Sequence, residues 1–392
     1  MLTVKKFNQI SDIIYTQMPQ DHYRFIEEGE DYDVALVRSA QLGEMSFPKQ
    51  LLAIARAGAG VDNIPVDRCS EEGIVVFNTP GANANAVKEL VLCGMILACR
   101  RIVPGIQWIQ RQYEEGIAGV DKRMEKAKKD FAGGEIAGKT LGVIGLGAIG
   151  VMVANAAVAM DMDVIGYDPF LSVDAALRLS RSVKLAKTQE ELLGRSDFLT
   201  LHLPQTAKTE GMINRNVLVA VKPGTILLNF ARGGLIDDDA VIEALESGQL
   251  GRYVTDFPND RIIANSKVIA MPHLGASTLE AEENCARMAA ARLKEYLISG
   301  TIKNSVNFPD CEYPLGEGWR IAIINRNVTN MVGQITAVLA QNGLNIEHML
   351  NHSRGAWAYT MIDLIKKPSQ TCLDALAGID GVVRIRLIGE ER

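Results

Sequence analysis

Short runs of apolar residues, separated by turn residues, recur along the first 95 residues of the chain. Asp33–Arg38, Leu52–Arg56 and Ile74–Phe77 are runs of this kind, and Gly, Asn or Pro closes them. Continuous apolar runs bounded by such residues predict strands of a parallel sheet that is buried on both faces. The pattern changes at Val87–Arg101, which predicts a mainly apolar helix.

A second series of alternating strands and helices extends from Thr140 to about Pro272, and Thr278–Leu297 predicts a further helix. The next segment, residues 299–318, is rich in Gly, Pro, Asn and Ser, which is the composition of a linker. Beyond it, residues 319–392 predict a small module with the order strand, helix, strand, strand, helix, strand. The chain therefore predicts at least two α/β domains and a C-terminal module.

One glycine-rich turn in the second series has the setting of a dinucleotide-binding site. The sequence Gly145-Leu146-Gly147-Ala148-Ile149-Gly150 follows a predicted strand and begins a helix. The backbone of such a turn approaches a pyrophosphate that lies at the helix N-terminus. The next predicted strand ends in Asp168, where this fold places an acid on the ribose hydroxyls. Because Asp168 would repel a 2′-phosphate and Pro169-Phe170 supply no arginine, we expect NAD rather than NADP.

The position of this turn in the chain predicts the domain order. A nucleotide-binding domain that begins this late is expected to be inserted into another α/β domain. We assign residues 96–278 to the nucleotide-binding domain, and residues 1–95 with 279–310 to the domain that surrounds it. Residues 311–318 are then the linker to the module at 319–392.

Three segments beyond the glycine-rich turn offer reactive side chains. Arg232 follows a predicted strand, and its guanidinium can hold a carboxylate and polarise a neighbouring carbonyl. His273 follows the last strand of the series, and the ordinary pKa of histidine suits proton exchange with an alcohol. Asp256 and Asp260 precede the histidine, and either carboxylate could orient its ring.

Composition narrows the class of protein. The 392 residues are 47% hydrophobic and 22% charged, as in soluble globular proteins of two or three domains. The net charge of −6 argues against a nucleic-acid partner. The longest apolar run, Leu90–Cys99, is far short of the roughly 20 residues of a membrane span. With no secretory signal at the N-terminus, we expect a cytoplasmic protein without a membrane partner. The 6 cysteines and 5 histidines are dispersed, so we expect no metal site.

The order of these motifs resembles the D-2-hydroxyacid dehydrogenase family over roughly residues 1–310. The motifs are G-x-G-x-x-G with Asp168, N-x-A-R-G-G around Arg232 and P-H-L-G-A-S-T around His273. Arg38-Ser39 and the A-G-x-G-V-D-N stretch at 57–63 are similar to members that act on 3-phosphoglycerate. The resemblance implies a Rossmann-like NAD-binding domain inserted into a flavodoxin-like substrate domain.

The resemblance also implies roles for particular residues. Arg38 and Ser39 would approach the substrate, the backbone at Ala59, Gly60 and Val61 would bind its carboxylate, and Asn78 lies in another substrate-domain motif. Arg232 and His273 would act at C2, with Asp260 in place of the family's glutamate beside the histidine. Asp256 matches a family acid near the nicotinamide. Besides the glycine-rich turn, Asp168 and Asp256, the cofactor contacts implied are Phe230, Ala231, Arg232, His273, Gly275 and Ala276.

The activity implied is NAD-dependent oxidation of 3-phosphoglycerate to 3-phosphohydroxypyruvate by hydride transfer from C2, the first step of serine biosynthesis. Two alternatives stay open within the family: another D-2-hydroxyacid dehydrogenase, or a glyoxylate or hydroxypyruvate reductase. A third alternative is a non-catalytic protein that binds and senses NAD.

The C-terminal module resembles an ACT domain, a small ligand-sensing module of amino-acid metabolism. Asn327 and Gly343-Leu344-Asn345-Ile346 carry this resemblance, which implies a ferredoxin-like α+β fold. It also implies a homo-oligomer, dimer or tetramer, and L-serine as an effector at Asn325, Asn327 and Asn345. In the turn after Asn327, we expect Asn330 to adopt the positive φ for which glycine is usual.

Overall fold

The computed structural model describes residues 1–389, which form two compact units. The first unit comprises Met1–Asn83 together with the chain from Leu279 onward, and the second unit is Ala84–Thr278. The predicted insertion of one α/β domain into another is confirmed. The division falls at Asn83, before the boundary expected at residue 95, because helix α2 (Ala84–Cys99) packs against helix α5 (Ala148–Ala159) of the second unit.

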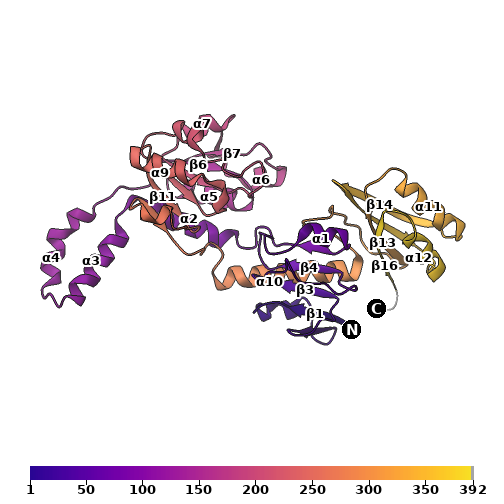
Figure 1. The fold of residues 1–392 in the computed structure, drawn as a ribbon. Helices are drawn as coiled ribbons and strands as arrows, with labels where there is room; N and C mark the ends of the chain where they lie inside the picture. The colour runs from indigo at the N-terminus through magenta and orange to yellow at the C-terminus, as the bar shows by residue number, and fades with distance from the viewer. Residues whose placement is uncertain (390–392) are drawn as a thin grey trace. The chain divides into compact units, whose positions relative to one another are not determined.

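The first unit contains a five-stranded parallel sheet with the order β2-β1-β3-β4-β5. This is the strand order of flavodoxin-like folds, as the sequence predicted. All four residues of β3 are buried, in agreement with its continuous apolar run. The long helix α10 packs against β3, β4 and β5 (Figure 1). The elements are β1 (Leu2–Lys6), η1 (Asp12–Thr16), β2 (Tyr23–Ile26), β3 (Val34–Val37), β4 (Ala53–Arg56), α1 (Val66–Glu71), β5 (Val75–Phe77) and α10 (Leu279–Ser299).

The same unit ends in a four-stranded antiparallel sheet with the order β14-β15-β13-β16. Helices α11 and α12 pack on one face of it (Figure 1). This α+β arrangement fits the ACT-like fold that the sequence predicted. The elements are β13 (Trp319–Arg326), α11 (Met331–Gln341), β14 (Ile346–Arg354), β15 (Trp357–Leu364), α12 (Gln370–Ala377) and β16 (Val382–Ile388).

The two sheets of the first unit share a hydrophobic core. Ile324 and Tyr359 of the antiparallel sheet belong to the same buried cluster as Leu293 and Tyr296 of α10. The half-buried Arg384 adds hydrogen bonds from its guanidinium to backbone carbonyls, including that of Glu72 at 3.0 Å. The C-terminal module is therefore packed against the parallel-sheet domain rather than tethered to it.

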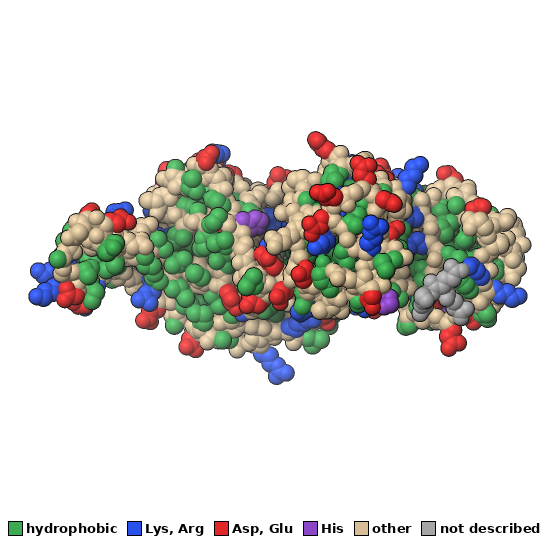
Figure 2. All heavy atoms as spheres, turned by 90° about the horizontal axis from the view of Figure 1, so that it is seen from below, with side chains coloured by type: hydrophobic (Ala, Val, Ile, Leu, Met, Phe, Trp, Pro, Cys, Tyr) green, Lys and Arg blue, Asp and Glu red, His purple; other side chains and the backbone are tan. Residues whose placement is uncertain are grey.

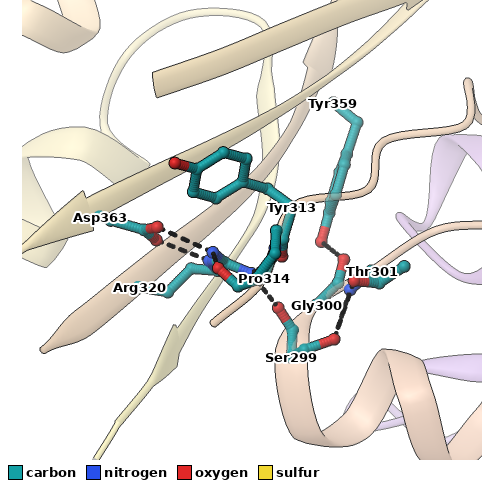
Figure 3. A network of polar contacts seen from close by, with 8 residues as sticks. All are labelled: Ser299, Gly300, Thr301, Tyr313, Pro314, Arg320, Tyr359 and Asp363. Carbon is teal, nitrogen blue, oxygen red and sulfur yellow. Dashed lines mark hydrogen bonds and ion pairs between the residues drawn. The ribbon is translucent and has the colours of Figure 1, made fainter. Parts of the chain in front are cut away.

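The segment expected as a linker, residues 311–318, is held in place by hydrogen bonds. Its carbonyl groups at Tyr313 and Pro314 accept hydrogen bonds from Arg320 (Figure 3). Just before it, the buried Asn307 donates to the carbonyl of Ile74 at 2.9 Å. Glycine and proline in this segment therefore shape a packed connection, which composition alone does not distinguish from a loose one.

The second unit contains a seven-stranded parallel sheet with the order β12-β11-β10-β9-β6-β7-β8. The strand order reverses between β6 and β9, where the carboxyl ends of the strands of such sheets bind ligands. The strands are β6 (Thr140–Ile144), β7 (Asp163–Tyr167), β8 (Lys184–Leu185), β9 (Phe198–Leu201), β10 (Thr225–Asn229), β11 (Leu250–Thr255) and β12 (Val268–Ala270). The sheet confirms the predicted Rossmann-like fold.

Helices connect these strands, and two further helices that precede β6 project away from the sheet (Figure 1). The connecting elements are α5 (Ala148–Ala159), α6 (Val173–Arg178), α7 (Gln189–Leu193), α8 (Arg215–Val219), η3 (Gly233–Leu235), α9 (Asp238–Ser247) and η4 (Ile262–Ala264). The projecting arm consists of α3 (Ile102–Glu114) and α4 (Val120–Ala127), followed by η2 (Lys128–Phe131) (Figure 1). Neither arm helix has a buried residue. Among the helices of residues 1–389, none is both long and apolar enough to cross a membrane.

Candidate functional site

The glycine-rich turn lies between β6 and α5, as the sequence predicted. Gly145 has a φ of +92°, and a Cβ on it would lie 2.5 Å from the carbonyl oxygen of His202. A Cβ on Gly150 would lie 1.9 Å from the carbonyl oxygen of Gly145. Both positions therefore require glycine. Gly147, by contrast, faces open space at the N-terminus of α5, which leaves room for a pyrophosphate to approach the backbone.

Asp168 directly follows β7 and is tied to this turn. Its Oδ2 accepts a hydrogen bond from the backbone N–H of Leu146 at 2.8 Å, and its Oδ1 accepts one from Phe170 at 2.8 Å. The carboxylate therefore stands beside the start of the glycine-rich turn, in the position of an acid that binds ribose hydroxyls. Together with the open backbone at Gly147, this arrangement fits NAD.

The turn is flanked by a histidine that sequence analysis did not single out. His202 follows β9, and its ring Nε2 lies 3.0 Å from the hydroxyl of Thr200. Burial lowers the pKa of His202 to about 3, so the ring is neutral. Its Nδ1 is buried and has no hydrogen-bond partner among residues 1–389. From the sequence alone, a single histidine after an apolar strand does not indicate this buried environment.

Arg232 lies three residues beyond the end of β10, at the carboxyl edge of the sheet. The buried amide of Asn229 fixes the backbone here, because its Nδ2 donates to the carbonyl of Arg232 at 2.9 Å and its Oδ1 accepts from Ala231 at 3.1 Å. The guanidinium donates to the carbonyl of Ala231 at 2.7 Å and is half-buried. Phe230 is buried, with its ring against Gly94 of α2. Its side chain therefore packs in the core, and only its backbone remains for a cofactor.

His273 lies just beyond β12, at the same edge of the sheet. Its φ of +36° is in the left-handed region, and its backbone N–H donates to the carbonyl of Asp256 at 2.9 Å. Its ring centroid is 4.6 Å from that of Phe257. The imidazole is exposed. The contacts with Asp256 and Phe257, just after β11, fix its position.

The carboxylate of Asp256 is buried beside this turn, with 1% of the residue exposed. Its Oδ2 accepts a hydrogen bond from the backbone N–H of Gly275 at 2.9 Å. Burial raises the pKa of Asp256, and the Gly275 hydrogen bond and the charges of His273 and Arg232 oppose that shift. This acid therefore acts electrostatically on the candidate base and holds the turn that carries Gly275 and Ala276.

Asp260, the acid first expected to orient the histidine, lies in an exposed turn further along. Asn259, the residue before it, caps this turn by accepting hydrogen bonds from the backbone N–H of Arg261 and Ile262. Pro258, Asn259 and Asp260 are all exposed, so Asp260 lies on the solvent side of this turn. Of the two acids, Asp256 is thus the one buried beside the turn of His273, and Asp260 is exposed.

In the first unit, the residues expected to approach the substrate form an organised loop after β3. The backbone N–H groups of Arg38, Ser39 and Ala40 all lie within 3.2 Å of the Oδ1 of Asn8. The Arg38 side chain pairs with Glu282 of α10 at 2.6 Å. Neither Asn8 nor Glu282 was identified from the sequence, because their partners lie far away along the chain.

The loop after β4 contains Ala59, Gly60 and Val61, the residues expected to bind a carboxylate. Its conformation is fixed by Asn78, whose Nδ2 donates to the carbonyl of Ala59 at 2.6 Å. A second guanidinium, Arg56, lies under this loop, 2.3 Å from a Cβ placed on Gly58. Arg56 also donates to the carbonyl of Arg38 at 3.1 Å, so it joins the two loops. Sequence analysis missed Arg56 because it ends an ordinary apolar strand.

The three residues expected to hold an effector are not together within this chain. Asn325 is buried, and its Nδ2 donates to the carbonyl of Arg326 at 2.8 Å. Asn327 donates to the carbonyl of Gly355 at 3.1 Å. Asn345 is exposed at the start of β14, at the opposite end of the sheet, because helix α11 carries the chain back along the sheet after β13. The positive φ expected for Asn330 is confirmed at +65°.

Comparison with known families identifies the second unit. Residues 93–276 match the family described as "D-isomer specific 2-hydroxyacid dehydrogenase, NAD binding domain". This range contains the whole seven-stranded sheet, the glycine-rich turn, Arg232 and His273. The chain therefore contains the NAD-binding domain of the D-isomer specific 2-hydroxyacid dehydrogenase family.

Similar proteins extend the likeness beyond that domain. The D-3-phosphoglycerate dehydrogenase of Methanocaldococcus jannaschii is 38% identical over 320 residues, which are 79% of this chain and 58% of that protein. The protein of the same name from Synechocystis is 36% identical over 288 residues, 71% of this chain and 49% of that protein. The chain spans about half the length of the curated relatives it matches.

Solved structures agree with the fold. The NAD+-bound 3-phosphoglycerate dehydrogenase of Entamoeba histolytica is 26% identical with a TM-score of 0.63, covering 78% of this chain and 98% of that one. A glyoxylate reductase from Paecilomyes thermophila is 25% identical with a TM-score of 0.65, over 78% of this chain and 98% of that one. Because proteins named for different substrates match equally well, the fold alone does not select the substrate.

Proposed function

We propose that this protein catalyses the NAD-dependent oxidation of 3-phosphoglycerate to 3-phosphohydroxypyruvate, the first step of serine biosynthesis. The observation that carries the proposal is the position of Arg232 and His273 at the carboxyl edge of an NAD-binding sheet, with the buried Asp256 beside the histidine. The names of the curated relatives support 3-phosphoglycerate as the substrate.

Different residues of the chain carry out different parts of the reaction. His273 takes the proton of the C2 hydroxyl, and the negative charge of Asp256 stabilises the imidazolium that forms. Arg232 pairs with the substrate carboxylate and stabilises the alkoxide-like oxygen at C2. When NAD is bound, it accepts the hydride that leaves C2.

In the first unit, we assign substrate binding to Arg38, Ser39 and the loop of Ala59, Gly60 and Val61. Glu282 holds Arg38, and Asn78 holds the second loop. Guanidinium groups and free backbone N–H groups suit phosphate and carboxylate ligands, which 3-phosphoglycerate carries at its two ends. Arg56, under the loop, adds positive charge to the same unit.

Steady-state kinetics on the Arg232→Ala variant tests this assignment. With NAD and 3-phosphoglycerate, we expect kcat/KM to fall by about a hundredfold or more, the usual loss when an oxyanion-stabilising group is removed. Arg261→Ala is a matched control, because Arg261 is exposed and pairs with Asp239 away from the sheet edge. If the Arg232 variant keeps its kcat/KM, another group stabilises the reacting oxygen.

Two further proposals concern assembly and regulation. The exposed Ile106, Ile109 and Tyr113 on α3 favour a homo-oligomer, dimer or tetramer, in which a second copy covers the arm. Hydrophobic side chains appear on the surface of the arm, at the left of the view in Figure 2. Sedimentation of the Ile106→Asp variant tests this, because we expect the oligomer of this variant to dissociate.

The C-terminal sheet would bind L-serine with residues from two copies, since Asn345 lies at the far end from Asn327. Calorimetry with L-serine tests this second proposal, and no heat at millimolar serine would exclude it. The cytoplasm remains the proposed location.

A further inference from the structure

A cavity lies where the chain enters the C-terminal sheet, at the start of β13. Its volume is about 310 Å³, at the lower end of the range for small-molecule sites. Its lining includes Tyr313, Leu315, Trp319, Glu347 and Asp363. Asn325, one of the residues assigned to an effector, is at the other end of β13, so this cavity is a separate place in the sheet.

The arginine beside the cavity has no hydrogen-bond donor left for a ligand. Arg320 is 0% exposed, and its Nε and Nη2 donate to the two oxygens of Asp363 at 2.6 and 2.8 Å (Figure 3). Its remaining donors bind the carbonyls of Ser299, Tyr313 and Pro314 at 2.9–3.0 Å. All five N–H groups are therefore used, and Arg320 cannot bind a carboxylate or phosphate in the cavity.

The charge that remains in the lining is negative. The carboxylate of Asp363 is balanced by Arg320, whereas Glu347 forms no ion pair within residues 1–389. Glu347 also lies at a break in the pairing of β14 with β15, between Ile346 and His348. Such a bulge redirects a side chain out of the regular alternation of a strand. The break in strand pairing and the unpaired carboxylate of Glu347 therefore lie together at the cavity.

The walls are aromatic and apolar. Tyr313 and His348 face each other with their ring centroids 5.0 Å apart, and Leu315 and Trp319 complete this side. The Trp319 ring already attracts one ammonium group of the chain, since the Nζ of Lys367 lies 4.5 Å from its centroid. Aromatic faces next to a carboxylate are the surroundings that proteins use to bind ammonium groups.

We propose that this cavity binds a small organic cation, an ammonium group attached to an apolar body. The ammonium group lies toward Glu347, and the apolar body packs against Tyr313 and Trp319. This inference does not depend on the proposed dehydrogenase activity, because every residue in it belongs to the C-terminal part of the first unit.

Occupation of the cavity would reinforce the attachment of the C-terminal sheet to α10. Tyr313 and Asp363 line the cavity, and both are hydrogen-bonded to Arg320. Arg320 in turn binds the carbonyl of Ser299, the last residue of α10. A ligand in contact with Tyr313 and Asp363 therefore stabilises the groups that join the two sheets, and we expect it to raise the unfolding temperature.

Isothermal titration calorimetry of the full chain near neutral pH tests the proposal with three probes of one apolar body. These are 3-methylbutylamine, a cation; 3-methylbutanol, a neutral molecule; and 4-methylpentanoate, an anion. We expect the amine to bind at least about tenfold more tightly than either other probe. We also expect the amine alone to raise the unfolding temperature measurably.

Three variants locate the binding. Glu347→Gln removes the unpaired charge and should weaken amine binding by about tenfold. Gly316→Phe fills the cavity from a lining position where a Cβ would meet no atom within 4 Å, and it should abolish binding. Glu317→Gln is the matched control, because Glu317 is an exposed neighbour that does not line the cavity, and it should bind like the parent.

Several results would overturn the proposal. These are no heat with millimolar amine, equal or tighter binding of the anion, and full amine binding by a folded Gly316→Phe variant. Far-ultraviolet circular dichroism establishes whether that variant is folded. If it is not, the comparison of Glu347→Gln with Glu317→Gln decides the matter, and equal affinities would refute the role of Glu347 and with it the cation site.

Discussion

The backbone N–H of His273 donates a hydrogen bond to the carbonyl of Asp256 across 2.9 Å. This bond joins the turn after β12 to the end of β11, and the Asp256 carboxylate then holds Gly275 two residues further on. A buried acid thus fixes the turn that presents an exposed imidazole. The arrangement supplies a candidate base, a negative charge near it and a rigid support, which are the requirements for general-base catalysis.

Replacement of His273 tests the base directly. We expect His273→Asn to lower kcat by about a hundredfold or more, because a positioned general base is lost, while NAD affinity stays within about twofold. Asparagine is preferred to alanine here, since it better tolerates the positive φ of this position. NADH absorbance measures turnover, and fluorescence titration measures NAD binding. His22→Asn, at an exposed site of the first unit, serves as the control.

Paired variants of the two acids test which one acts on the histidine. We expect Asp256→Asn to lower kcat by about tenfold or more, because the imidazolium loses a nearby negative charge. Asp260→Asn should keep kcat within about twofold, since its side chain is exposed in the following turn. Steady-state rates decide between them. The reverse pattern would restore Asp260 as the partner of His273.

Asp256 should also lower the stability of the protein at neutral pH. Burial raises its pKa above the ordinary value of 3.8, so the folded state binds this proton more readily than the unfolded state. Its contribution to the unfolding free energy is therefore fully present below about pH 3.8 and is lost as the pH rises through the raised value. Asp256→Asn removes that loss, because asparagine carries no charge to bury.

We expect the Asp256→Asn variant to melt higher than the parent near neutral pH, by about 2–4 °C for a gain on the order of 1 kcal/mol. The difference should shrink as the pH falls toward 3.8, because the raised pKa makes the parent carboxyl take up its proton in the folded state first. Calorimetric melting curves of both proteins across this range measure it. A variant that melts lower than the parent at neutral pH would show that the ionised carboxylate stabilises the fold.

The preference for NAD over NADP depends on Asp168. The parent should prefer NAD to NADP by a wide margin in kcat/KM, because the carboxylate repels a 2′-phosphate. Asp168→Ala should narrow that margin, mainly through weaker NAD binding, since the hydrogen bonds to Leu146 and Phe170 are lost as well. Kinetics with both cofactors measure the ratio. Equal use of NAD and NADP by the parent would contradict the assignment of Asp168.

The parts of the site that depend on local sequence were predictable. A tight turn after a strand needs glycine at particular positions, so the sequence itself predicts the backbone conformation at Gly145 and Gly150. Arg232 and His273 each follow an apolar strand, and strands in a parallel sheet present their carboxyl ends at one edge. Chain order alone therefore placed these side chains at the carboxyl edge of the sheet.

The parts that depend on distant contacts were not predictable. Asp256 and Asp260 follow the same strand four residues apart, yet the first is buried and the second is exposed. Glu282 and Arg38 are 244 residues apart, so nothing local indicates their ion pair. The packing of the linker at 311–318 was not predictable for the same reason, because glycine and proline occur in packed connections as well as in flexible ones.

A substrate panel with NAD tests the central claim most directly. Initial rates of NADH formation are compared for 3-phosphoglycerate, D-lactate, D-glycerate and 2-hydroxyglutarate under identical conditions. We predict that 3-phosphoglycerate has the highest kcat/KM of the four, by at least about tenfold, because Arg38 and Arg56 supply positive charge for a phosphorylated acid. A higher kcat/KM with any unphosphorylated acid would contradict the proposed substrate, and no NADH from any of them would contradict the proposed dehydrogenase.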